Sequence, residues 1–92
     1  MDEVVARPEP HRQARGRRRI EAILDAADRV ILRQQSTALS LPDVAGEAGL
    51  PVASLYHYFP TPAAVQVALA RRYLLALEAL AAQPLAHGEL AQ

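Results

Sequence analysis

Apolar side chains recur along the chain with the spacing of amphipathic helices, and no stretch alternates in the way a strand does. Between Ile20 and Ile31 they fall at intervals of three and four residues, which places them on one side of a helix. The pattern predicts a first helix from Gly16 or Arg17 to Arg33 or Gln34. Its inner face consists of Ile20, Ile23, Leu24, Ala27, Val30 and Ile31.

A short second helix is marked at both ends. Ser40 can cap a helix from Leu41 to about Ala48, because its hydroxyl can accept a hydrogen bond from a free N–H of the first turn. Gly49 can end the helix in the left-handed conformation, and Leu50-Pro51 then turns the chain.

Two further helices complete the pattern. The third runs from Val52 to about Tyr58, with Leu55 and Phe59 pointing inward. The fourth follows a cap at Thr61, begins at Pro62 and continues to about Gln83. Its predicted buried stripe is Val65, Ala68, Leu69 and Leu80.

Two short helices joined by a tight turn and supported by a longer first helix are typical of the helix-turn-helix plan. The predicted fold class is therefore all-α: a three-helix, homeodomain-like helix-turn-helix bundle plus a longer fourth helix. The helix-turn-helix motif covers residues 40–59. In this arrangement one face of the third helix can enter the major groove of DNA. The predicted exposed face carries Val52, Ala53, Ser54, Tyr56, His57 and Tyr58, although Tyr58 is equally compatible with packing.

Composition excludes several other classes. The chain has 92 residues, enough for one small domain, and it has no cysteine, so disulfides and thiolate chemistry are absent. Its three histidines are too scattered to suggest a metal site, and no cofactor is indicated. Ser54 and His57 lie three residues apart, but no third group orients the histidine, so the chain is not expected to be an enzyme.

The net charge of zero conceals an asymmetry. Residues 7–19 contain six arginines and one acid, so the basic character is concentrated near the N-terminus. Residues 1–14 are predicted to form a flexible basic arm. The arginines at the end of this arm and just after it can follow DNA phosphates or enter the minor groove, or they belong to a solvated tail. The arginines concerned are Arg12, Arg15, Arg17, Arg18 and Arg19.

The predicted fourth helix carries two features of its own. Arg71 and Arg72 can meet phosphate, but a solvated face is the favoured interpretation. The leucines of this helix are too many for one stripe, and they either pack on the first helix or form a partner surface. They are Leu74, Leu75, Leu77 and Leu80.

The motifs of these helices resemble the DNA-binding domain of TetR-family transcriptional regulators. The resemblance is carried by Ile23-Leu24-Asp25-Ala26-Ala27, by Asp43-Val44-Ala45 with Ala48-Gly49-Leu50, and by Ser54-Leu55-Tyr56-His57-Tyr58-Phe59. It implies a DNA-binding domain over residues 17–77, with residues 78–92 as the end of the fourth helix and a frayed tail. It also implies a transcription regulator, most often a repressor. The expected location is the cytoplasm, because the sequence has no apolar stretch of about 20 residues and its N-terminus does not resemble a signal peptide.

The resemblance also implies roles for single residues. Tyr56 matches a tyrosine whose hydroxyl reaches a phosphate, and Ser40 matches a hydroxyl cap near the DNA backbone. His57 and Tyr58 match positions that touch base edges or backbone, and Ser54 matches a small hydroxyl residue near the groove. The expected DNA-binding residues are therefore Ser40, Val52, Ala53, Ser54, Tyr56, His57, Tyr58, Arg15, Arg17 and Arg18.

Several positions depart from the family pattern. Pro62 stands where a phosphate-binding lysine is common, Pro42 where an arginine is often found, and Val52 where a polar or basic residue is usual. The ligand-binding and dimerisation helices of the family are not seen, so no inducer site is expected. The expected partner is double-stranded DNA, with a homodimer or a heterodimer with a longer relative through the fourth helix. The alternative is a degenerate domain that binds proteins without specific DNA binding.

Overall fold

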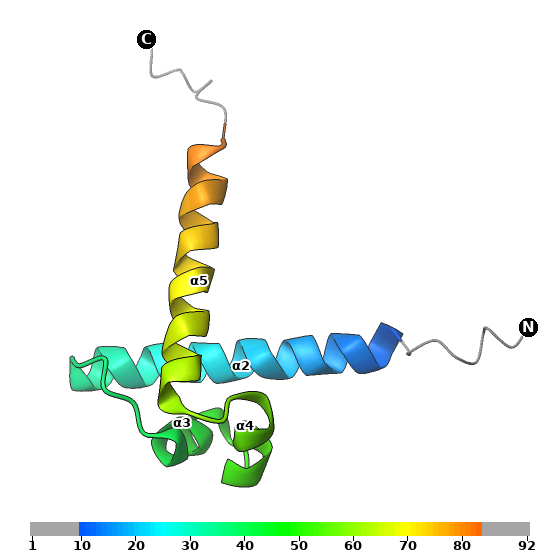
Figure 1. Ribbon diagram of the computed structural model, residues 1–92, viewed down its shortest axis with the longest axis vertical. Coiled ribbons are helices and arrows are strands. Elements are labelled where there is room, and N and C mark those ends of the chain that lie inside the picture. The colour runs from blue at the N-terminus through cyan, green and yellow to red at the C-terminus, as the bar shows by residue number, and fades with distance from the viewer. Residues whose placement is uncertain (1–9, 84–92) are drawn as a thin grey trace, which may run out of the picture.

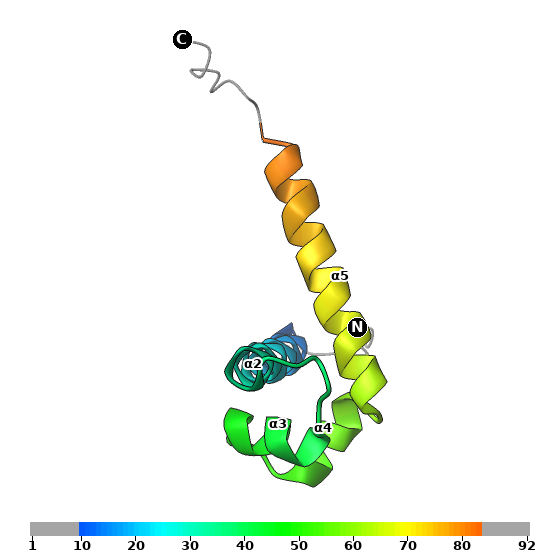
Figure 2. The ribbon, with the colours of Figure 1, turned by 90° about the vertical axis from the view of Figure 1, so that its left-hand side faces the viewer.

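The computed structural model describes residues 10–83, which form four helices (Figure 1). They are α2 (Pro10–Gln34), α3 (Leu41–Ala48), α4 (Val52–Tyr58) and α5 (Pro62–Ala81). Both α3 and α4 lie beneath α2, and α5 crosses α2 and extends away on the other side (Figure 1, Figure 2). The described part contains no strand, and the all-α helix-turn-helix arrangement with a longer last helix is confirmed.

The first helix begins earlier than the sequence pattern predicted. It starts at Pro10 rather than at Gly16 or Arg17, so residues 10–14 are helical and their assignment to a flexible arm was wrong. The reason is local: proline suits the first position of a helix, and arginine, glutamine and alanine are strong helix formers even without an apolar stripe. Residues 1–9 of the expected arm lie outside the described residues.

The short helix α3 ends where the sequence predicted. Ser40 accepts a hydrogen bond from the backbone N–H of Asp43 at 3.4 Å, which satisfies one free donor of the first turn. Gly49 has φ 72°, the left-handed conformation that only glycine adopts at little cost. The N–H of Leu50 then bonds the carbonyl of Ala45 at 2.9 Å, which closes the turn into α4.

The core lies where all four helices meet. The expected inner face of α2 is confirmed at Ile23, Leu24, Ala27 and Val30, while Ile20 and Ile31 are only half-buried. Ala26 is also fully buried, which the apolar stripe did not predict. The remaining core residues come from the other three helices and the C-cap of α4; they are Leu41, Val44, Ala45, Leu55, Phe59, Val65 and Leu69.

Only the first half of α5 joins this core. Thr61 caps the helix by accepting from the N–H of Ala64 at 3.1 Å, as predicted, and Val65 and Leu69 are buried. Leu80 was expected in the buried stripe but is 62% exposed. It lies eleven residues beyond Leu69, roughly 16 Å farther along the helix, past the elements that form the core. The leucines at 74, 75 and 77 are exposed as well, so they do not pack on α2.

Candidate nucleic-acid interface

The helix α4 is held by one face and open on the other. Leu55 is fully buried and Phe59, at the C-cap, is 8% exposed, so the predicted inward pair is confirmed. Tyr56 is 46% exposed, and Ala53 and His57 are exposed beside it. Tyr56 and His57 follow Ala53 by three and four residues, so the three positions lie on one side of the helix. The open face of α4 is therefore Ala53, Tyr56 and His57.

Val52 and Ser54 are less exposed than predicted, and Tyr58 takes the packed alternative in part. Val52 and Tyr58 are half-buried and pack against the core, and Ser54 is half-buried. The cause is helix geometry: Val52 and Tyr58 lie three residues before and three after the buried Leu55, which places both beside the buried face. Tyr58 also meets His57 edge to face, with ring centroids 5.1 Å apart.

Ser40 lies apart from α4, at the start of α3. Its side chain is exposed, and its hydroxyl accepts from the helix while its own O–H remains able to donate. The arginines of the expected site, Arg15, Arg17 and Arg18, are exposed on the first half of α2. Six of the ten expected site residues thus lie on α4, three of them on its open face, and the other four lie on α2 or at the start of α3.

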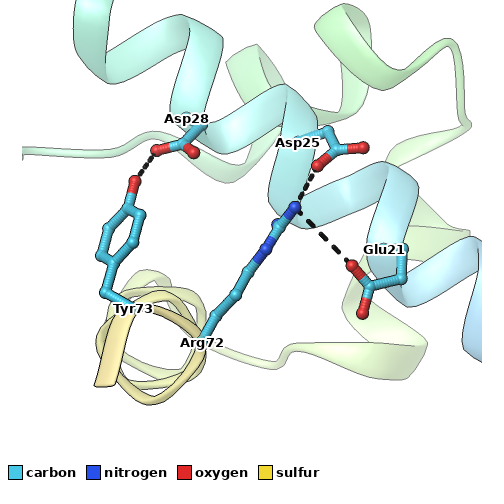
Figure 3. A network of polar contacts seen from close by, with 5 residues as sticks. All are labelled: Glu21, Asp25, Asp28, Arg72 and Tyr73. Atoms are coloured by element: carbon cyan, nitrogen blue, oxygen red, sulfur yellow. Dashed lines mark hydrogen bonds and ion pairs between the residues drawn. The ribbon is translucent and has the colours of Figure 1, made fainter. Parts of the chain in front are cut away.

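A polar network that the sequence analysis missed joins α5 to α2. Arg72 bonds Asp25 and lies 3.6 Å from Glu21, and the Tyr73 hydroxyl bonds Asp28 (Figure 3). Arg72 is half-buried, with its Nη1 atom buried and unpaired, so its expected solvated position was wrong. The three acids follow one another at intervals of four and three residues, and this spacing was the available sequence signal.

The same contacts affect the ionisation of both α5 residues. The hydrogen bond to Asp25 raises the pKa of Arg72 further, although burial of the guanidinium opposes this. The hydrogen bond to the Asp28 carboxylate raises the pKa of the Tyr73 phenol above its usual value, and burial acts in the same direction. The neutral phenol and the charged guanidinium are therefore the forms that hold α5 on α2.

A second set of ion pairs fixes α3 beneath α2. Glu47 accepts from Arg29 Nε at 2.8 Å and lies 3.1 Å from Arg33 Nη1. These two hydrogen bonds, with Arg29 first, lower the pKa of the Glu47 carboxyl. Because α3 supports α4, this contact helps to fix the direction in which α4 presents its open face.

Residues 10–83 contain no cluster of three or more histidine, cysteine or acidic side chains that could hold a metal ion. None of their helices has the length and apolar character required to cross a bilayer.

Comparison with known proteins gives one match. A sequence model of the family described as "Bacterial regulatory proteins, tetR family" matches residues 23–69. The matched segment begins at the core residue Ile23, contains all of α3 and α4, and ends at Leu69 in α5. No curated protein and no solved structure gives a significant match to the chain.

Proposed function

Because the chain belongs to the tetR family of bacterial regulatory proteins, a family of DNA-binding helix-turn-helix regulators, we propose that it is a repressor that reads the major groove with α4. Repression follows from occlusion, since a protein seated on a promoter excludes the transcription machinery from it. The proposed DNA-binding unit covers residues 17–77, and the protein acts in the bacterial cytoplasm, where the chromosome lies.

The observation that carries this proposal is the division of α4 into an anchored and an open face. Leu55 and Phe59 fix the helix from behind, and Tyr56 and His57 remain exposed on the other side. A helix anchored in this way can enter the groove without repacking the core. A helix whose aromatic residues all faced inward would have nothing to present to DNA.

Each open residue suits a particular contact. The Tyr56 hydroxyl can donate to a phosphate, and the His57 ring can reach a base edge or the backbone. Ala53 can meet a thymine methyl group, which is an apolar contact that distinguishes bases. At the start of α3, Ser40 can donate its remaining O–H to a second phosphate. The half-buried Val52, Ser54 and Tyr58 border this face and contribute less of their surface.

A matched pair of tyrosines tests the proposal. A labelled duplex of random sequence is titrated with protein at low and at physiological salt. Binding is expected at low salt and is expected to fade as salt rises, because bound counterions are released. Tyr56→Phe is expected to weaken binding by about 1 kcal/mol on every sequence. Tyr73→Phe, which also removes one hydroxyl, lies on α5 and is expected to leave DNA affinity unchanged.

Three results would contradict the proposal. The first is no binding by the wild-type protein even at low salt. The second is equal loss of affinity in the two phenylalanine variants. The third is a wild-type protein that recovers no preferred sequence from a random duplex pool, since reading the major groove with α4 must influence which sequences are recovered.

We further propose that two copies of the chain pair through α5. Val67, Leu74 and Leu77 are 67%, 58% and 62% exposed, and their spacing of seven and three residues is that of a helix-pairing seam. The seam lies on the side of α5 away from the Val65 and Leu69 contacts with the core. Pairing covers apolar surface and doubles the number of phosphate contacts on DNA.

Sedimentation velocity tests the pairing. The wild-type protein is expected to reach twice the monomer mass as its concentration rises, and Leu74→Glu is expected to remain a monomer because a charge in the seam is costly to bury. Leu75→Glu, outside the seam on the same helix, is the control and is expected to pair. A wild-type protein that stays monomeric at every concentration, with and without duplex, contradicts the proposal.

A further inference from the structure

The buried face of α2 continues toward the N-terminus as a line of arginines. Ile23, Ala26 and Val30 are 0%, 0% and 3% exposed on the face that packs against α3. Moving back from Ile23 by steps of four, four and three residues leads to Arg19, Arg15 and Arg12. Residues at this spacing share one side of a helix, and α2 is one continuous helix from Pro10 to Gln34. We call Arg12, Arg15 and Arg19 the arginine stripe.

The arginine stripe faces the same side of α2 as the helix-turn-helix. Both views show α3 and α4 beneath α2, and Figure 1 shows the N-terminal half of α2 extending past α4. Because the stripe continues the face that packs on α3, it lies over the space beside α4. From Arg19 to Arg12 it covers seven residues, roughly 10 Å, which corresponds to about three base pairs of DNA.

The two remaining arginines of this segment lie on another side of α2. Arg17 and Arg18 line a surface depression together with Glu21 and Asp25. Glu21 and Asp25 are the residues that contact Arg72 on α5, so this side of α2 is turned toward α5 and away from the side of α3. The five arginines of residues 10–19 are therefore divided between two surfaces.

The arginine stripe is electrostatically unfavourable for the isolated helix. The N-terminal end of a helix carries partial positive charge, and α2 has no acid in its first turn. Residues 10–20 contain five arginines and no acid, so these side chains also repel one another. An anion near Arg15 and Arg19 reduces both penalties, and the phosphates of a duplex bound beneath α4 would lie on that side.

We propose that the arginine stripe binds the phosphates of the DNA strand that borders the groove entered by α4, as a rigid helical extension of the helix-turn-helix. This rests on the proposed function, because it requires α4 to be on DNA. The proposal assigns the contacts with the DNA backbone to Arg15 and Arg19, with Arg12 extending the same line. It places Arg17 and Arg18 outside the interface with DNA.

Two double variants with equal charge test the assignment. Arg15→Gln/Arg19→Gln and Arg17→Gln/Arg18→Gln each remove two positive charges from the same exposed helical segment, and glutamine keeps the helix propensity close to that of arginine. A random-sequence duplex of about three helical turns is titrated at several salt concentrations. Each lost phosphate contact reduces the slope of log K against log salt by about 0.9.

The expected result separates the two variants. The Arg15/Arg19 variant is expected to lose about 1.8 from the salt slope and roughly fifty-fold in affinity near 0.1 M salt, and the Arg17/Arg18 variant is expected to keep a slope close to that of the wild type. Arg15→Lys/Arg19→Lys keeps the charges and is expected to keep the slope. Circular dichroism melts confirm that all variants remain folded.

Other outcomes overturn the assignment. If both glutamine pairs reduce the slope equally, the segment acts only through its total charge and the stripe has no special position. If neither pair changes the slope while Tyr56→Phe still weakens binding, the proposed function survives and the stripe is wrong. If the wild-type protein binds no duplex at low salt, both proposals fall together.

Discussion

The helices α2 and α5 each have one half in the core and one half beyond it, and the two outer halves differ in chemistry. The outer half of α2 carries five arginines, whereas the outer half of α5 carries four leucines that are 58–62% exposed. Both are regular helix, and neither is covered by the described part of the chain. The two outer halves therefore do not differ in helical structure, but they differ in the kind of surface that each can contact.

The difference is in the kind of surface that each half needs. Arginine keeps its charged head in water and gains most from an anion, so the outer half of α2 needs no apolar partner and is suited to a phosphate backbone. Leucine side chains gain only when apolar surface leaves water, at about 25 cal/mol per Å². The outer half of α5 is therefore suited to another apolar helix, and the inner halves, where α2 and α5 meet, link the two surfaces.

The largest expected effect separates the inner half of α5 from its outer half. Leu69→Ala is expected to destabilise the protein by about 2–5 kcal/mol, because it leaves a cavity at a residue that is 3% exposed. Leu74→Ala makes the same change five residues later at a 58% exposed position and is expected to cost less than about 0.5 kcal/mol in the monomer. Thermal melts at low protein concentration measure both. Equal losses would mean that the outer half is packed after all.

A second prediction compares a packed helix with the outer half of α2. A Cβ at Gly46 in α3 or at Gly16 in α2 meets no atom within 4 Å, so alanine fits at both positions. Gly46→Ala is expected to stabilise the protein by about 1 kcal/mol, raising the melting temperature by about 4–8 °C. Gly16→Ala is expected to slow hydrogen exchange in residues 13–20 about five-fold with a smaller change in melting temperature, since this segment can open without the core.

If both alanine variants raised the melting temperature equally, the outer half of α2 would unfold together with the core. That result would count against treating it as a separate surface. A fall in melting temperature for Gly46→Ala would contradict the open space observed at that position.

The sequence was most informative where capping residues and buried periodicity agree. Ser40, Gly49 and Thr61 mark helix ends through hydrogen bonds or backbone conformation that depend on residues close in sequence, so these boundaries were predictable. The inward position of Leu55 and Phe59 followed from their spacing of four residues. The roles of the open residues on DNA remain predictions.

The sequence misled where local signals conflict with the surroundings. The start of α2 has no apolar stripe, and its helix follows from propensity and from Pro10 at the first position. Leu80 belongs to an apolar helix, but its exposure depends on how far the neighbouring helices reach, which spacing does not encode. Arg72 reaches acids 47 and 51 positions away in sequence, so only the packed structure shows its partners.

A smaller effect is expected at the link between the two inner halves. Arg72→Met is expected to lower the free energy of unfolding by about 0.5 kcal/mol, because its acid partners are more than half exposed and the change also removes an unpaired buried nitrogen. A double-mutant cycle with Asp25→Asn isolates the coupling, with an expected value of about 0.5 kcal/mol that decreases with added salt. A coupling near zero would mean that the Arg72–Asp25 pair does not help to hold α5 on α2.

The smallest expected effect is a pH dependence at the link between α2 and α3. Arg29 and Arg33 hold the pKa of Glu47 below its usual 4.5, so the charged carboxylate stabilises the folded state above that pH. This contribution is lost as pH falls through the lowered folded pKa. Glu47→Gln removes it, so the variant is expected to be less stable than the wild type at neutral pH and equally stable in strong acid. Melting temperatures measured from pH 7 to pH 2 at low salt test this. A difference that stays constant over the range would show that Glu47 acts through packing and hydrogen bonding rather than through its charge.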